Sequence, residues 1–326
     1  MERKEVETAT DYVRRIFINN PQISNIFDDI SDCREFSDGI HEPDCMIVVG
    51  DTGAGKTTLI EKYLAKNPRS EKKDGSVIPI LSTSLPPNAT PITASEQLLS
   101  DLGDPLAFSR GSDPVKIAKE MSDLMKSCGV ELIIIDEFQH MIDRKNRQIL
   151  HSAADWLKML IVRSKIPVVL FGMPYSVVIL EANNQLAGRF ELQHTLGPFR
   201  LDSKDNRSHY KTFLTMLDQA LPFKESSDLA SPDMMKRIYA FSQGNLRRIR
   251  KLINRASKLA ERDNSNTILM KHFSEAAPKV SNVACKKQNP FQVKISKLRL
   301  THPPENIGWE NYLSQQEKDS SLKDVF

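Results

Sequence analysis

The sequence predicts an α/β fold with a five-stranded parallel sheet, followed by a small all-helical domain. Three observations support this prediction. Short apolar runs alternate with helical patterns up to about residue 200. A glycine-rich loop joins the first run to a helical pattern, and two adjacent carboxylates end a later run. Beyond residue 200 the strand patterns stop and helical patterns continue.

The glycine-rich loop has the residues and spacing of a phosphate-binding loop, Gly50-Asp51-Thr52-Gly53-Ala54-Gly55-Lys56-Thr57. In this spacing glycines let backbone N–H groups turn toward a polyphosphate, and the following helix adds its positive N-terminal end. We expect the residues from Gly50 to Thr58 to contact a nucleotide, Lys56 to reach the β- and γ-phosphates, and the Thr57 hydroxyl to hold Mg²⁺. The alternative is an ordinary glycine turn between a strand and a helix.

Composition narrows the class of protein only broadly. The chain has 326 residues, of which 40% are hydrophobic and 27% charged, so we expect a large and a smaller globular domain. No apolar run reaches the roughly 18 residues of a membrane span, and the first residues lack the apolar core of a signal peptide. We therefore expect a cytoplasmic protein without a membrane partner. The formal charge of +3 is small, so contact with nucleic acid would need a local basic stripe.

The N-terminal segment, residues 1–44, carries helical patterns over 6–18 and 23–27. Two interpretations stay open for it, a cover over the adenine base and a helical cap on the core. The first strand spans 46–49. A strand over 76–81 should lie at a sheet edge, because Pro79 inside it cannot donate to a strand ladder.

Two helices should precede the next strand. The pattern Thr93 to Glu96 resembles a capping box and predicts a helix over 96–102. Asp113 followed by Pro114 predicts an N-cap for a helix that reaches about residue 128.

Two carboxylates, Asp136 and Glu137, follow the apolar run 132–135. Such a run suits a strand buried on both faces of a parallel sheet, whose carboxyl end faces the ligand crevice. We expect Asp136 to hold Mg²⁺, directly or through water, and Glu137 to orient the water that attacks the γ-phosphate. A plain strand end is the alternative, and the phosphate-binding loop earlier in the chain favours the catalytic interpretation.

The remaining patterns complete the expected domains. A helix over 146–163 and strands over 167–171 and 191–196 close an α/β domain of residues 45–200. Helical patterns over 203–217, 231–241, 245–262 and 267–277 make an all-helical domain of residues 201–277. Residues 278–326 are polar and are expected to be partly disordered or to dock on a partner.

Four separated motifs together resemble a known family. They are the phosphate-binding loop, Ile134-Ile135-Asp136-Glu137-Phe138-Gln139-His140, Leu186-Ala187-Gly188-Arg189-Phe190 and Gly244-Asn245-Leu246-Arg247-Arg248. Their order over residues 10–275 resembles AAA+ ATPases of the initiator and clamp-loader branch. Within that branch the chain looks most like the TniB/TnsC family, ATP-dependent regulators of DNA transposition. The resemblance implies an AAA+ P-loop NTPase with a small all-helical lid domain.

The resemblance also implies roles for two arginines. AAA+ proteins bind ATP between neighbouring subunits, and Arg189 matches the arginine that reaches a neighbour's γ-phosphate, where it would stabilise transition-state charge. The alternative is a surface arginine beside Phe190. Arg247 matches the lid arginine that senses nucleotide in its own subunit. Alternatively, Arg247, Arg248 and Arg250 form a solvated or DNA-facing basic helix.

One departure from the family pattern concerns the fourth strand. AAA+ proteins usually end this strand in a polar residue that helps to position the attacking water, whereas here it runs Phe171-Gly172-Met173. Tyr175 or Ser176 could substitute, and neither is assigned. Slow hydrolysis, suited to a timer, would be consistent with this gap.

Family members form rings or helical filaments on duplex DNA with ATP and recruit a transposase. Their position is set by a target-selection factor, in some members a TniQ-type protein joined to an RNA-guided complex, as in CRISPR-associated transposons. Sequence-independent DNA contacts are expected from the segment between the second and third strands. Arg110, Lys116 and Lys119 are the candidates there, unless they form an exposed helix face.

Three functions compete on this sequence. The first is an ATPase switch that assembles on DNA with ATP and disassembles on hydrolysis, which the intact Glu137 favours. The second is a nucleotide-bound DNA scaffold with negligible turnover, which the missing strand-end polar residue favours. The third is a replication-initiator or helicase-loader ATPase. A DNA-binding domain after the lid would support this function, but the sequence has only a polar segment there.

Overall fold

The computed structural model describes residues 9–36, 42–73, 75–109, 113–142, 147–280 and 288–301. The chain divides into two compact units. Among the described residues, a helical unit comprises residues 9–21, 53–55 and those from 197 to 301, and an α/β unit comprises those from 22 to 52 and from 56 to 196. None of the described helices is both long and apolar enough to cross a membrane.

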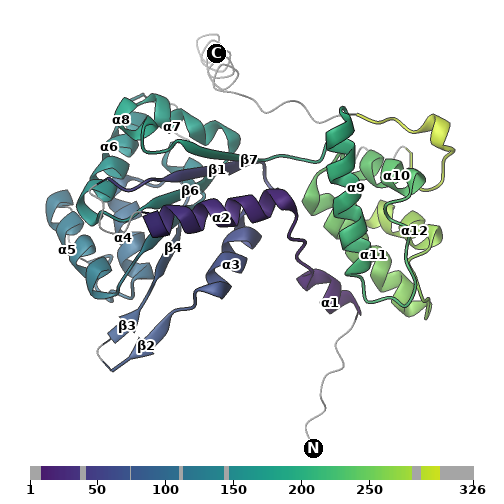
Figure 1. Cartoon of the computed structure of the whole chain (residues 1–326), viewed down its shortest axis with the longest axis horizontal. Helices are drawn as coiled ribbons and strands as arrows, with labels where there is room; N and C mark the ends of the chain where they lie inside the picture. The colour runs from purple at the N-terminus through teal and green to yellow at the C-terminus, as the bar shows by residue number, and fades with distance from the viewer. Residues whose placement is uncertain are drawn as a thin grey trace, which may run out of the picture. The chain divides into compact units, whose positions relative to one another are not determined.

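The α/β unit is built on a five-stranded parallel sheet in the order β4-β5-β6-β1-β7 (Figure 1). The strands are β1 (Met46–Gly50), β4 (Ile80–Ser84), β5 (Leu132–Asp136), β6 (Val168–Gly172) and β7 (Leu192–Leu196). Every residue of β1, β5 and β6 is buried, as expected for a parallel sheet covered on both faces. The predicted five-stranded parallel sheet is confirmed.

Helices cover both faces of this sheet. They are α2 (Pro21–Phe36), α3 (Lys56–Lys66), α4 (Pro91–Asp101), α5 (Pro114–Ser127), α6 (Arg147–Ser164), α7 (Val178–Glu181) and α8 (Asn184–Ala187), with the 3-10 helices η1 (Phe138–Met141) and η2 (Pro174–Val177). Helices α4 to α8 share one apolar cluster with the sheet. Right-handed crossovers place α3 on the opposite face. Helix α2 joins α3 there through the Phe27 and Tyr63 rings, whose centroids are 5.8 Å apart.

The segment before β4 corrects one sequence expectation. The strand expected over 76–81 is two elements, because β3 (Gly75–Val77) ends before Pro79 and β4 begins after it. Strand β3 pairs antiparallel with β2 (Ser70–Lys72), a hairpin that the sequence did not predict. Strand β4 does lie at a sheet edge, as the proline suggested.

The start of α4 corrects a second expectation. The helix was expected from residue 96, and it begins at Pro91 with Thr90 as N-cap. The Thr90 hydroxyl accepts from the Thr93 N–H at 3.2 Å, and the Thr93 hydroxyl accepts from the Thr90 N–H at 2.8 Å. The capping box predicted at Thr93 and Glu96 is therefore wrong: both residues lie inside α4, and the box that begins the helix is formed by Thr90 and Thr93.

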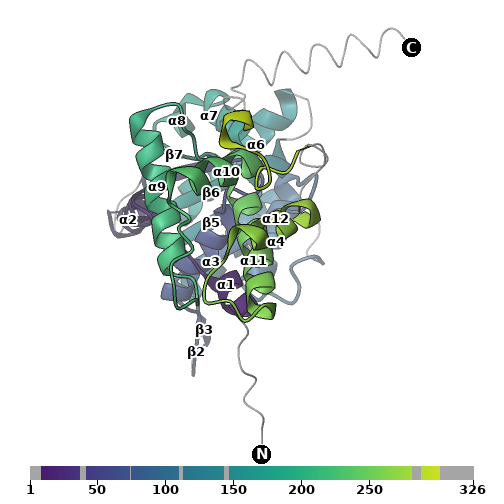
Figure 2. The ribbon, with the colours of Figure 1, turned by 90° about the vertical axis from the view of Figure 1, so that its right-hand side faces the viewer.

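The helical unit contains α1 (Ala9–Arg15), α9 (Lys204–Gln219), α10 (Pro232–Ser242), α11 (Leu246–Arg262), α12 (Met270–Val280) and the 3-10 turn η4 (Ile295–Lys297) (Figure 2). The four helices predicted after residue 200 are all present. Their apolar faces form a second core, which also takes in Val13 of α1. Tyr210 and Tyr239 are fully buried in it and meet edge to face at 5.8 Å.

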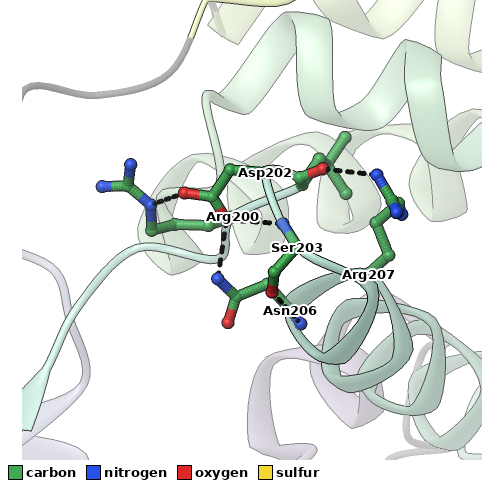
Figure 3. Close-up of polar contacts among 6 residues, drawn as sticks. Arg200, Asp202, Ser203, Asn206 and Arg207 are labelled. Atoms are coloured by element: carbon green, nitrogen blue, oxygen red, sulfur yellow. Dashed lines mark hydrogen bonds and ion pairs between the residues drawn. The ribbon is translucent and has the colours of Figure 1, made fainter.

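A polar cluster begins α9 (Figure 3). The Ser203 hydroxyl accepts from the Asn206 N–H at 3.0 Å, which is the N-cap hydrogen bond. The Asp202 carboxylate accepts from the Asn206 side-chain amide at 2.6 Å and from the Ser203 N–H at 2.9 Å, and it pairs with Arg200. These contacts, the Asn206 amide above all, lower the pKa of Asp202 to about 2. The helix N-terminus therefore faces a carboxylate that stays ionised in mild acid.

The described residues 288–301 pack on the helical unit. One guanidinium nitrogen of the buried Arg237 donates to the carbonyl oxygens of Pro290 and Val293, at 2.5 and 2.8 Å. The Phe291 ring stacks on Phe273 at 5.3 Å. This part of the polar C-terminal segment is thus a component of the second core.

The turn between α10 and α11 gives a testable prediction. Gly244 has φ +76°, and a Cβ there would lie 2.8 Å from the carbonyl carbon of Phe199. Gly244→Ala should therefore lower the free energy of unfolding in urea by at least about 2 kcal/mol, through a left-handed backbone and a clash with main chain. Gly129→Ala is the control, since φ is +65° but nothing lies within 4 Å, and it should cost about 1 kcal/mol. Equal losses would contradict the role of the close approach.

Candidate nucleotide-binding site

The phosphate-binding loop connects β1 to α3. Gly53 and Gly55 have φ of +87° and +102°, which L side chains rarely adopt, so glycine is needed at both. Lys56 is the first residue of α3 and is buried. Its ammonium donates to the Gly50 carbonyl at 2.5 Å and lies 3.5 Å from the Asp51 carbonyl. Backbone carbonyls therefore hold the lysine charge within the loop, where it can contact phosphate oxygens.

Thr57 and Asp136 lie in contact at the carboxyl ends of the parallel strands. The Thr57 hydroxyl donates to the Asp136 carboxylate at 3.1 Å, and the Glu137 N–H donates to the other Asp136 oxygen at 2.8 Å. Asp136 is buried, and burial raises its pKa, while these two hydrogen bonds and the Lys56 charge oppose the rise. A bound cation would remove the cost of keeping this carboxylate ionised.

The oxygen donors at this position suit magnesium. Hydroxyl and carboxylate oxygens are hard ligands, and Mg²⁺ commonly takes one or two from protein and the rest from phosphate and water. Within the described ranges, no group of three or more His, Cys, Asp or Glu side chains could hold a metal ion. Thr57 and Asp136 therefore fit an ion that arrives with a polyphosphate and do not form a closed metal site.

Glu137 turns the chain from β5 into η1. Its φ is +55° and its ψ +35°, a left-handed conformation that costs a non-glycine residue about 1–2 kcal/mol. Such strain is concentrated at functional sites. One Glu137 carboxylate oxygen accepts from the side-chain amide of Gln139, and the other makes no hydrogen bond within the part of the chain that the structure describes.

Gln139 is a site residue to which sequence reasoning gave no role. Its side chain is buried, and its amide oxygen accepts from the Met173 N–H at 3.2 Å. Met173 follows β6, and its sulfur accepts a weak hydrogen bond from the Thr52 hydroxyl at 3.8 Å. The signal in the sequence was the position of Gln139 two residues after Glu137. Gln139 belongs to the motif on which the family resemblance rests, but its side chain was given no role there.

The two residues considered as substitutes at the end of β6 have different surroundings. Ser176 is fully buried, and its hydroxyl has no partner among the described residues. It faces Gly172, where a Cβ would lie 2.9 Å from the Ser176 Cβ. Tyr175 packs against the apolar cluster of the α/β unit.

Arg189 lies at the other end of β1 from the phosphate-binding loop. Its carbonyl accepts from the Cys45 N–H at 2.7 Å, directly before β1, and its guanidinium pairs with Glu42 at 2.9 Å. Strand β1 has five residues, about 16 Å at roughly 3.3 Å each. Arg189 therefore does not belong to the phosphate site of its own chain.

Arg247 contacts the loop glycines within the helical unit. Its N–H donates to the Gly53 carbonyl at 3.2 Å, and a Cβ on Gly53 would lie 2.7 Å from the Arg247 Cβ. The guanidinium groups of two neighbouring arginines donate to acceptors within the helical unit. Arg248 donates to the Gln243 side chain at 3.0 Å and Arg250 to the Arg14 carbonyl at 2.7 Å.

The three residues expected to contact DNA are Arg110, Lys116 and Lys119. Lys116 and Lys119 are exposed on α5. Arg110 lies outside the described residues. The structure therefore leaves their expected role as a prediction.

The buried carboxylate predicts a pH dependence of stability. The pKa of Asp136 is raised, so the folded chain binds its proton more tightly than the unfolded chain, and stability falls as pH rises from about 3.8 through the raised value. In EDTA without nucleotide, Asp136→Asn should therefore have a higher free energy of unfolding than wild type at pH 7, with the difference shrinking in acid. Urea unfolding at several pH values measures this. A variant less stable than wild type at pH 7 would contradict the burial cost.

Comparisons with solved structures concern the fold of the chain. Three archaeal structures resemble the chain: ORC2 of Aeropyrum pernix in ADPNP and ADP complexes, ORC1 of Aeropyrum pernix in complex with DNA, and Cdc6p of Pyrobaculum aerophilum. The TM-scores are 0.54, 0.53 and 0.56, at identities of 15%, 16% and 13%. The matches cover 81%, 83% and 83% of this chain and 68%, 67% and 70% of those chains. At such identities the likeness shows the fold, which is that of AAA+ ATPases.

A search among curated proteins found no match. The profile of the family described as Bacterial TniB protein matches residues 10–199, more than half of the chain. This match spans the phosphate-binding loop, the carboxylate pair and Arg189. The protein is therefore a member of the TniB family, with an AAA+ fold.

Proposed function

We propose that this protein is an ATP-dependent regulator of DNA transposition. With ATP bound it assembles on duplex DNA as a ring or helical filament, links a target-selection complex to the transposase, and leaves the DNA after hydrolysis. The observation that carries the proposal is the separation of the site into two halves in a TniB-family chain. Lys56, Thr57, Asp136 and Glu137 lie at the carboxyl ends of the strands and Arg189 near the amino ends, which supports a site that Arg189 of a second copy completes.

The residues at the carboxyl ends of the strands have separate roles in ATP hydrolysis. Backbone N–H groups of the loop and Lys56 bind the phosphates, Arg247 senses the nucleotide, and Thr57 and Asp136 hold Mg²⁺, which neutralises phosphate charge when bound. The oxygen of a water oriented by Glu137 bonds to the γ-phosphorus while the bond to the bridging oxygen breaks. That electron pair remains on ADP, and the water proton passes by way of Glu137 to the released phosphate.

Arg189 of a neighbouring copy neutralises negative charge on the γ-phosphate in the transition state. Its guanidinium is held by Glu42 at 2.9 Å in the single chain, and only 13% of its side chain is exposed. A planar guanidinium that is already ordered loses little side-chain freedom when it turns to phosphate. The alternative, a structural surface arginine, would leave turnover independent of assembly.

The proposed partners are duplex DNA, which exposed lysines would bind, and the protein partners that the family resemblance implies. Duplex DNA would be held through its phosphates by exposed lysines such as Lys116 and Lys119, without base readout. The likeness to an ORC1 structure solved in complex with DNA supports a DNA partner. The transposase, and a TniQ-type protein with or without an RNA-guided complex, are proposed from the TniB/TnsC resemblance.

Two other functions stay in competition. A replication-initiator or helicase-loader role is favoured by the fold likeness to ORC and Cdc6 proteins, and the TniB match over residues 10–199 weighs against it. A nucleotide-bound scaffold without turnover is favoured by the lack of a polar side chain at the end of β6.

Electron microscopy of the purified chain with duplex DNA tests the assembly. Rings or filaments should require both DNA and a slowly hydrolysed ATP analogue. Lys56→Ala should abolish them, because the loop loses the charge that binds phosphate. Lys62→Ala, on the same helix, is the matched control and should assemble normally. Monomers of the wild-type chain under all conditions, or normal assembly of Lys56→Ala, would contradict the proposal.

Mixing two inactive variants tests the shared site. Arg189→Ala should bind nucleotide normally and lose roughly 10³-fold in ATP turnover, the usual value of a transition-state arginine. Glu137→Gln should bind ATP and stay assembled on DNA. A mixture of the two should recover turnover, because an intact site in one copy meets Arg189 of the next.

A variant of the ion pair is the control for this mixture. Glu42→Ala keeps the Arg189 guanidinium but removes the partner that orders it, so its turnover should fall far less than that of Arg189→Ala. No recovery in the mixture would remove the support for a site shared between copies.

A further inference from the structure

The end of β6 lacks a hydrogen-bonding side chain for a steric reason. Residue 172 is glycine, and a Cβ there would lie 2.9 Å from the Ser176 Cβ and closer still to its hydroxyl oxygen. The first turn of η2 therefore fills the space into which a side chain from the strand end would project. A side chain on residue 172 itself is therefore excluded, and the polar atoms beside this position belong to Ser176 and Gln139.

Gln139 brings an amide to this place from η1. The residue is 5% exposed. Its amide oxygen lies 3.4 Å from the Cβ position of residue 172 and accepts from the Met173 N–H at 3.2 Å. The same amide donates through its nitrogen to the Glu137 carboxylate. One buried side chain therefore joins the end of β6 to the carboxylate that follows β5.

The two partners determine how the amide is oriented. The Met173 N–H can only donate, and an ionised Glu137 carboxylate can only accept, so the amide oxygen must face Met173 and the nitrogen Glu137. Reversing the amide would oppose two donors on one side and two acceptors on the other. One Glu137 oxygen is thereby held, and the second is left for water.

We propose that Gln139 is the positioning residue for Glu137 and stands in for the polar residue missing from the end of β6. This inference rests on the proposed ATPase function. Gln139 does not touch the nucleotide; it acts through the Glu137 carboxylate, which it holds in one orientation. The chain therefore keeps a complete water-orienting arrangement, assembled from β5 and η1 and anchored to β6.

Gln139→Met tests the proposal, because methionine has a similar volume and makes neither hydrogen bond. ATP turnover should fall about 10- to 100-fold, the usual effect of removing a group that orients a catalytic side chain. Affinity for a slowly hydrolysed ATP analogue should change less than about twofold, because the loop is untouched. Gln139→Asn, one methylene shorter, cannot span both partners and should lose turnover in the same direction.

A double variant separates positioning from a general loss of structure. In a Glu137→Gln background, Gln139→Met should cause no further loss, because the residue through which it acts is already removed. Ser95→Ala is the matched control, since it removes another buried side-chain hydrogen bond, that from the Trp156 indole at 2.9 Å. It should leave turnover near wild type.

Hydrogen exchange supplies a readout independent of turnover. The Met173 amide should exchange faster in Gln139→Met than in wild type or Ser95→Ala, in the absence of nucleotide. Wild-type turnover in Gln139→Met, or equal losses in both backgrounds, would overturn the inference while leaving the ATPase function intact. A wild-type chain without ATP turnover on DNA would instead overturn the proposed function and this inference with it.

Discussion

The parallel direction of the strands is the constraint on which the rest of the site depends. Since β1 and β5 run the same way, the residues that follow them come to one edge, and the Thr57 hydroxyl reaches Asp136 at 3.1 Å. Since β7 also runs parallel to β1, the residues that precede it lie at the opposite ends of the strands, where Arg189 pairs with Glu42. The parallel direction of the strands thus brings the phosphate-binding residues together at one end of the sheet and places Arg189 at the other end.

The two carboxylates at the carboxyl ends of the strands lower the stability of the folded chain at the proposed catalytic site. Asp136 is buried with a raised pKa, and Glu137 adopts a left-handed backbone that glycine or asparagine would tolerate better. Neither feature helps the isolated chain to fold. Both are compatible with a site whose charge balance is completed by phosphates and a cation from outside.

Much of this architecture could be predicted from sequence because its signals are local. Apolar runs gave the five strands, and the glycine spacing gave the phosphate-binding loop, because each depends on neighbours along the chain. The failures involve contacts between distant residues. Gln139 meets Met173 only when two strands lie side by side, and Thr90 caps α4 through a threonine that the usual glutamate pattern does not include.

The packing of residues 288–301 has a consequence for where the helical domain ends. Counting helices would end it near residue 277, yet Phe291 stacks on Phe273 and two later carbonyls accept from the buried Arg237. A chain cut at 277 would expose the Phe273 ring to water and leave a buried cation short of two acceptors, each a cost of about 1–3 kcal/mol. Residues 288–301 of the polar segment thus contribute to the hydrophobic core, and removing them would remove part of what the helical domain needs to fold.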